Sequence, residues 1–124
     1  MSVVYDVLSA LQSAGVGTLS SDLFGFSMPE TPNNCIVVFP SGGYPRDKAG
    51  FLQYPSVMIH VRNTSSTTAE IKANSVISAL HRIANTTING TRYQSIYSVN
   101  EAVSLGKDDQ QRETLSINFE ITRS

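Results

Sequence analysis

A strict alternation of apolar and polar residues near the C-terminus constrains the fold of this chain more than any other feature. Its apolar members are Leu115, Ile117, Phe119 and Ile121, each separated from the next by one polar residue. Successive side chains of a strand point to opposite faces of a sheet, so the pattern predicts a strand with one buried face. The chain must therefore build a sheet that is covered on one side.

Two earlier segments also favour strands. Residues 35–39, Cys-Ile-Val-Val-Phe, form a short apolar run rich in β-branched residues, which predicts a buried central strand that Pro40 stops. Residues 55–62 alternate, with Val57, Ile59 and Val61 on one face. The glycine-rich and proline-containing stretch between Ser41 and Gly50 predicts a long loop.

A hairpin is predicted after residue 85. Asn89-Gly90 is the preferred dipeptide of a two-residue hairpin turn and would join residues 86–88 to residues 91–99. Tyr93 and Tyr97 would then share one strand face and pack on the sheet. The charged residues between Gly106 and Arg112 predict a loop before the closing strand, and residues 19–34 predict a connector with one short extended piece near residues 23–26.

Helical spacing appears in two places. Val4, Val7, Leu8, Leu11 and Ala14 recur every three or four residues, which predicts a helix over residues 3–14 that Ser2 caps and Gly15 ends.

A second helix is predicted from a capping box of Thr67 and Glu70. Its apolar stripe reaches Ile83 and Ala84, and His81 and Arg82 fall in its last turn, where cations suit the helix dipole.

These elements predict one α+β domain over residues 1–124. Two helices are too few to connect every strand in parallel, so we expect a mainly antiparallel or mixed sheet of about four to five strands, with both helices on one face.

Charge and cysteine content exclude several classes of function. Nine basic and ten acidic residues give a net charge of −1, which argues against tight non-specific binding to nucleic acid. A single cysteine excludes an internal disulfide framework and suits a reducing cytoplasm. Residues 1–15 lack the pattern of a signal peptide, and no apolar stretch is long enough to span a bilayer, so no membrane partner is expected.

Residues that could carry chemistry are few. A thiol site could draw only on Cys35, His60 and His81, which are more simply explained by a buried strand, a polar strand face and a helix end. Their positions show none of the short spacings of a zinc site, and Ser41-Gly42-Gly43 does not match a phosphate-binding loop. We therefore expect no catalytic, cofactor-binding or metal site, and no enzyme activity.

The order of four segments resembles the tail-terminator family of long-tailed (siphovirus-type) bacteriophages, also called minor capsid proteins. The segments are residues 34–45, residues 54–62, the hairpin over residues 87–93, and residues 105–119. Together they span most of the chain. One departure is Gln111, which stands where the family has a glycine before the loop arginine, and it leaves the geometry of that turn open.

The resemblance implies a structural virion protein. Such a protein is a subunit of a homo-oligomeric ring, usually a hexamer, that caps the finished tail tube, ends its polymerisation and joins it to the head. Its implied partners are the major tail tube protein and a head-completion or neck protein. DNA would pass through the lumen without specific binding. The implied location is the head-proximal end of the tail, after assembly in the host cytoplasm.

Three alternatives remain at this point. The chain could be a head-completion or stopper protein of the neck, or a non-viral binding or adaptor module that uses the loop around Tyr44 and the sheet face at His60. The third is an enzyme that pairs Cys35 with a histidine.

Overall fold

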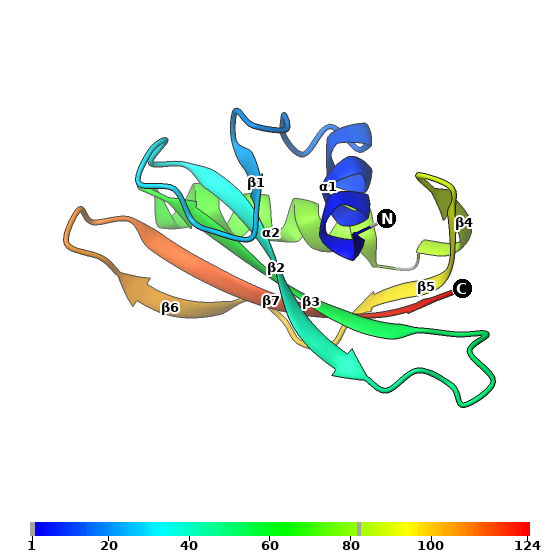
Figure 1. Ribbon diagram of the computed structural model, residues 1–124. Helices are drawn as coiled ribbons and strands as arrows, with labels where there is room; N and C mark the ends of the chain where they lie inside the picture. The colour runs from blue at the N-terminus through cyan, green and yellow to red at the C-terminus, as the bar shows by residue number, and fades with distance from the viewer. Residues whose placement is uncertain (1, 82) are drawn as a thin grey trace.

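One twisted sheet carries both helices on the same face (Figure 1). The computed structural model describes residues 2–81 and 83–124. Its elements in chain order are α1 (Val3–Ser13), β1 (Leu23–Gly25), β2 (Cys35–Tyr44), β3 (Tyr54–Asn63), α2 (Ser66–Leu80), β4 (Ile83–Ile88), β5 (Thr91–Ser98), β6 (Val103–Lys107) and β7 (Glu113–Arg123). The predicted α+β class is confirmed.

The predicted count of four to five strands is wrong, because the sheet has seven. The additional strands are β1 and β6, which have three and five residues. β1 coincides with the short extended piece predicted near residues 23–26, whereas β6 was not predicted. Gly106 and Lys107, expected in a loop, belong to β6, which pairs with the first half of β7.

The sheet is mixed, as predicted. Its order is β1-β2-β3-β7-β5-β4, with β6 beside β7; β1 runs parallel to β2, and the other pairs are antiparallel. The strand over residues 35–39 was expected to be central, but β2 is second from the edge. The two strands at the ends of this order differ in length and direction. β1 has three residues and runs parallel to its neighbour, whereas β4 has six residues and runs antiparallel to its neighbour.

The core lies between the sheet and the helices. Alternate residues of β3 and β7 point into it, and the α1 side chains at positions 4, 7, 8 and 11 are fully buried against them. Ala14 was predicted on this buried face but is exposed, because it follows the last residue of α1 as its C-cap.

The ends of α1 agree with the predicted caps. The Ser2 hydroxyl accepts a hydrogen bond from the Val4 amide, and Gly15 takes a φ of +78° after the last turn. The Val16 amide then donates to the Leu11 carbonyl, which closes the helix in a Schellman motif.

The predicted start of α2 is wrong by two residues. Ser65, not Thr67, is the N-cap, and its hydroxyl accepts from the Thr68 amide at 3.3 Å. The helix ends at Leu80, so Ile83 and Ala84 pair in β4 instead of extending the apolar stripe. His81 is the C-cap, and Arg82 lies outside the described residues.

Pro40 does not stop β2. The Ile36 amide and the Val38 carbonyl bond to the β1 side, so Pro40, two residues on, also turns its nitrogen away from β3. No hydrogen bond to β3 is lost there, and a proline is tolerated at such an edge. Ser41 to Tyr44 were expected in a loop but continue the strand.

A bulge in β5 overturns the prediction for Tyr93 and Tyr97. The register against β7 shifts between Tyr93 and Ser95, which inserts one extra residue. Tyr93 is therefore fully buried under α1, while Tyr97 is 41% exposed on the other face. The turn that precedes β5 is as predicted, since Asn89 and Gly90 both have positive φ.

Candidate assembly surface

The sheet face opposite the helices is largely open. The register places Phe39, Met58, His60 and Asn118 on it, together with Tyr97 from β5. Glu120 is also on this face, and its carboxylate accepts a hydrogen bond from the Tyr97 hydroxyl at 2.6 Å. The other residues of this set are apolar or neutral, and such groups cost less to remove from water than charged ones.

β6 adds apolar side chains to this open face. Val103 pairs with Ser116 and is 51% exposed, and Leu105 is 57% exposed beside a hollow that Met28 and His60 also line. Exposed aliphatic side chains on a β-strand favour contact with another protein surface.

His60 lies on the open face and lines the same hollow as Leu105. Its ring packs against Phe39 in a T-shaped arrangement with ring centroids 5.0 Å apart. Burial lowers the pKa of His60 below its ordinary value, since the charged imidazolium is poorly solvated there.

One end of the open face is covered by residues 28–34, which Arg62 holds in place. Its guanidinium donates to the carbonyls of Pro29 at 2.7 Å, Pro32 at 2.7 Å and Asn33 at 3.0 Å. Arg62 was expected on a polar strand face but is only 5% exposed, because this loop folds over it.

Arg112 holds the same loop as well. It donates to the Glu30 carbonyl at 2.8 Å and to the Asp108 carboxylate at 2.7 Å. Gln111 adopts a φ of +60°, the left-handed conformation that a glycine takes without strain. Gln111 stands in place of the family's glycine, yet the residue before Arg112 still has a left-handed conformation. Arg112 itself contacts residues of its own chain.

The β2–β3 hairpin projects beyond the body of the molecule and is called the arm below (residues 41–56; Figure 1). A bulge between Pro40 and Gly43 marks its beginning. A side chain at position 43 would place its Cβ 2.1 Å from the Tyr54 carbonyl oxygen, so only glycine fits there. Four strand residues extend the arm by roughly 13 Å at about 3.3 Å each.

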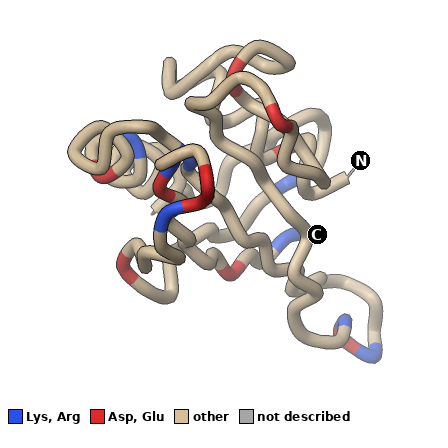
Figure 2. The backbone as a smooth tube through the Cα atoms, turned by 90° about the vertical axis from the view of Figure 1, so that its left-hand side faces the viewer, with Lys and Arg blue, Asp and Glu red and all other residues tan. Residues whose placement is uncertain are grey.

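The arm tip, residues 45–53 between β2 and β3, is folded by hydrogen bonds within the arm. The Asp47 amide donates to the Leu52 carbonyl at 3.2 Å, and the Tyr54 hydroxyl donates to the Asp47 carboxylate at 2.8 Å. Two basic side chains, Arg46 and Lys48, flank Asp47, and Figure 2 shows this charge pattern at the end of the arm. Phe51 is 76% exposed beside them.

A buried polar network anchors the base of the arm. The backbones of Gln53 and Arg123 exchange two hydrogen bonds, and the Arg123 side chain donates to Gln53 Oε1 at 3.0 Å and to the Tyr93 hydroxyl at 3.3 Å. Tyr93 in turn donates to the carboxylate of Asp6, which is fully buried in α1. Burial and the Asp6 carboxylate raise the pKa of Tyr93, so it remains a hydrogen-bond donor.

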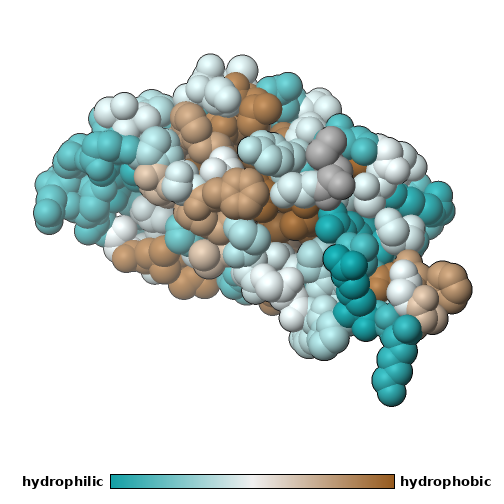
Figure 3. Space-filling model, in the orientation of Figure 1, coloured by the Kyte–Doolittle hydropathy of each residue, from teal (hydrophilic) through white to brown (hydrophobic). Residues whose placement is uncertain are grey.

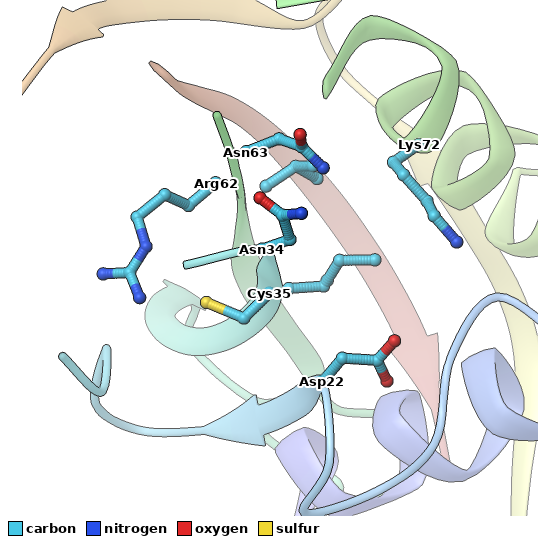
Figure 4. Close-up of a pocket in the computed structure, with 8 residues that line it drawn as sticks. Asp22, Asn34, Cys35, Arg62, Asn63 and Lys72 are labelled. Atoms are coloured by element: carbon cyan, nitrogen blue, oxygen red, sulfur yellow. The ribbon is translucent and has the colours of Figure 1, made fainter. Parts of the chain in front are cut away.

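Cys35 and the histidines do not form a catalytic arrangement in the described part of the chain. The Cys35 thiol is 3.4 Å from the Met28 sulfur, and burial raises its pKa, which disfavours the nucleophilic thiolate. The hollow beside it has a volume of about 40 Å³, and the described residues around it include no histidine. Figure 4 shows the sulfur turned away from Asp22 and Lys72.

His81 is placed elsewhere. Its Nδ1 accepts from the Ser98 amide at 3.2 Å, so it packs the end of α2 onto β5. Among residues 2–81 and 83–124, no group of three histidine, cysteine, aspartate or glutamate side chains could hold a metal ion. No helix within those ranges is long and apolar enough to cross a membrane.

Comparison with known proteins decides the family. The sequence model of the bacteriophage tail terminator protein matches residues 10–124. The chain belongs to the phage tail terminator family. It is thus a structural protein of a phage tail, and the resemblance seen in its sequence is confirmed.

Solved structures share the fold of this tail terminator. A chain from the virion of a native gene transfer agent particle aligns with a TM-score of 0.75 and 15% identity, over 98% of this chain and 93% of that chain. A second solved structure aligns with a TM-score of 0.52 and 14% identity, over 97% and 96% of the two chains. No match was found among curated protein sequences.

Sequence reasoning missed three residues that shape this surface. Asp6 was not predicted to be buried, although an aspartate next to buried positions of a helix needs a buried partner. Gln53 and Arg123 are far apart in sequence, and no local pattern relates them.

Proposed function

We propose that this tail terminator is one subunit of a ring, a homohexamer, that caps the tail tube and ends its polymerisation. The ring sits at the head-proximal end of the tail, joins it to a head-completion or neck protein, and assembles in the host cytoplasm. DNA passes through its lumen without specific binding. Residues 1–124 act as one domain in this role.

The observation that carries the proposal is the family match over residues 10–124. Two structural features support it. The two edge strands of the sheet, β1 and β4, differ from each other. A ring built from identical subunits needs two different, complementary surfaces on each subunit. The open sheet face and the arm offer such surfaces. The net charge of −1 includes no basic surplus that would favour non-specific binding of DNA.

The test is to add purified protein to polymerising tail tube protein. The proposed cap should stop elongation at substoichiometric amounts, with the protein found only at tube ends by immunogold labelling. Unchanged elongation, with the protein bound instead to purified heads, would favour a stopper of the neck and contradict the cap.

A further inference from the structure

The arm tip carries charges without partners. Arg46 and Lys48 are exposed, and neither makes a hydrogen bond or ion pair with any described residue of its own chain. Asp47 between them accepts the hydrogen bond from the Tyr54 hydroxyl, and the two basic residues leave the tip with a net positive charge. Figure 3 shows strongly hydrophilic side chains beside an apolar group on the projecting arm. Because these hydrogen bonds already order the backbone of the tip, docking costs mainly the rotamer freedom of the Arg46 and Lys48 side chains.

A cleft of about 480 Å³ lies between α2 and β6. Three carboxylates line it, those of Glu70 from α2, Glu101 from the β5–β6 connection and Glu113 from β7. The described residues that line it include no lysine or arginine, while Ala102 and Leu115 add apolar surface.

The three carboxylates differ in their partners. Glu113 is held by its own chain, since the Ser66 and Ser104 hydroxyls lower its pKa with a smaller effect of Lys107. Glu70 and Glu101 are exposed and make no hydrogen bond or ion pair through their side chains within residues 2–81 and 83–124. The cleft therefore presents two unpaired negative charges to solvent.

The two surfaces lie at opposite ends of the molecule. The arm tip precedes β3, and α2 begins just after β3. The length of β3, ten residues or roughly 33 Å at about 3.3 Å each, therefore separates the tip from the start of α2. Figure 1 shows the arm at the lower right and β6 at the left.

We propose that the arm tip of one subunit docks in the acidic cleft of the next, with Arg46 and Lys48 facing Glu70 and Glu101. Phe51 covers the apolar part of the cleft. The contact rests on the proposed ring and specifies how its subunits join. The occupant of the cleft is a second copy of this chain, because the arm has the complementary charge and stands at the opposite end. A head-to-tail contact of this kind gives a ring when the rotation between neighbouring subunits closes.

Charge reversal tests this contact. The arm variant carries Arg46→Glu and Lys48→Glu, and the cleft variant carries Glu70→Lys and Glu101→Lys. A control variant, Arg92→Glu with Asp109→Lys, reverses exposed charges outside both surfaces. Thermal melting of each variant shows that it is folded, and native mass by mass photometry reports assembly.

Each reversed variant alone should need about tenfold or more protein than wild type to assemble, because like charges meet in the contact. An equimolar mixture of the two should regain rings, since each arm then finds a cleft of opposite charge. Raising the salt from about 0.1 M to about 1 M, which shortens the Debye length from about 10 Å to about 3 Å, should dissociate wild-type rings.

Folded arm and cleft variants that assemble like wild type would overturn the contact and leave the ring itself standing. A mixture that stays dissociated would also overturn it. An arm variant that forms rings but no longer binds tail tubes would assign the arm to the tube protein instead. Wild-type protein that assembles neither alone nor on tail tubes would contradict the proposed ring.

Discussion

Arg123 and Gln53 join the last strand to the base of the arm. Their backbones are linked by hydrogen bonds of 2.7 and 3.0 Å, and a third bond of 3.0 Å joins their side chains. Arg123 also lies 3.9 Å from the buried Asp6 carboxylate. The arm is thus fixed to the same network that fastens α1 to the sheet, so its direction is set by the core.

The Asp6→Ala substitution tests this network. It removes the acceptor of the Tyr93 hydroxyl and of the Asn89 side-chain Nδ2 at 2.9 Å, and leaves the buried Tyr93 hydroxyl without that partner. We expect the free energy of unfolding to fall by about 2–5 kcal/mol, measured by urea denaturation. Ser9→Ala is the control, since it loses only an exposed bond to Asn89 and should cost less than about 1 kcal/mol. Equal effects of the two substitutions would show that the network does not stabilise the fold.

Gln111→Gly should stabilise the protein. Gln111 is held at a φ of +60°, where a side chain is strained and glycine is not. The gain should be up to about 1 kcal/mol, because the extra freedom of glycine in the unfolded chain offsets part of the relieved strain. Gln111→Ala keeps the Cβ and should bring no gain in the same thermal unfolding series. A loss of stability in the glycine variant would mean that the glutamine side chain itself supports the loop.

Gly43→Ala should disrupt the arm. The new Cβ would clash with the Tyr54 carbonyl oxygen, so the bulge must open at a cost of about 1–3 kcal/mol. Gly42→Ala is the matched control, because it also has a positive φ of +87° but meets no atom within 4 Å. Amide hydrogen exchange should show lost protection in the arm for Gly43→Ala and retained protection for Gly42→Ala. Equal exchange in both variants would contradict the steric role of Gly43.

Protonation of His60 should oppose folding. Its pKa is lowered in the folded protein, so below the ordinary value of 6.5 the unfolded chain binds a proton that the folded chain resists. Stability should fall as the pH drops through 6.5 and level off below the folded pKa. His60→Gln should have a shallower slope than wild type in urea unfolding between pH 7.5 and 5. An NMR titration of His60 at or above 6.5 would refute the burial effect.

Strong local periodicity made α1, β3 and β7 predictable from sequence. Leu115 and Ile117 point inward as their alternation indicated, and Ser2 and Gly15 end α1 through bonds within a few residues. The incorrect predictions concern positions where contacts between residues distant in sequence determine the local structure. Pro40 is tolerated because its nitrogen faces away from β3, and the bulge after Tyr93 has no local sequence signal.

The assembly surface was harder to predict than the fold. The glycine-rich stretch around Tyr44 predicts a loop, whereas Gly43 allows a close approach of the two chains that continues the strand pairing into the arm. Arg62 on β3 and Arg112 just before β7 contact the same loop, and the pairing of β3 with β7 brings these distant residues together. Side chains that act across such distances leave no spacing pattern in a single sequence.

The most direct test is the length of phage tails assembled without this protein, measured in negative-stain images. A cap that ends polymerisation predicts tails of abnormal and widely varying length that fail to join heads. Purified protein added before tube assembly should restore a single length. Tails of normal, uniform length in its absence would contradict a role in termination.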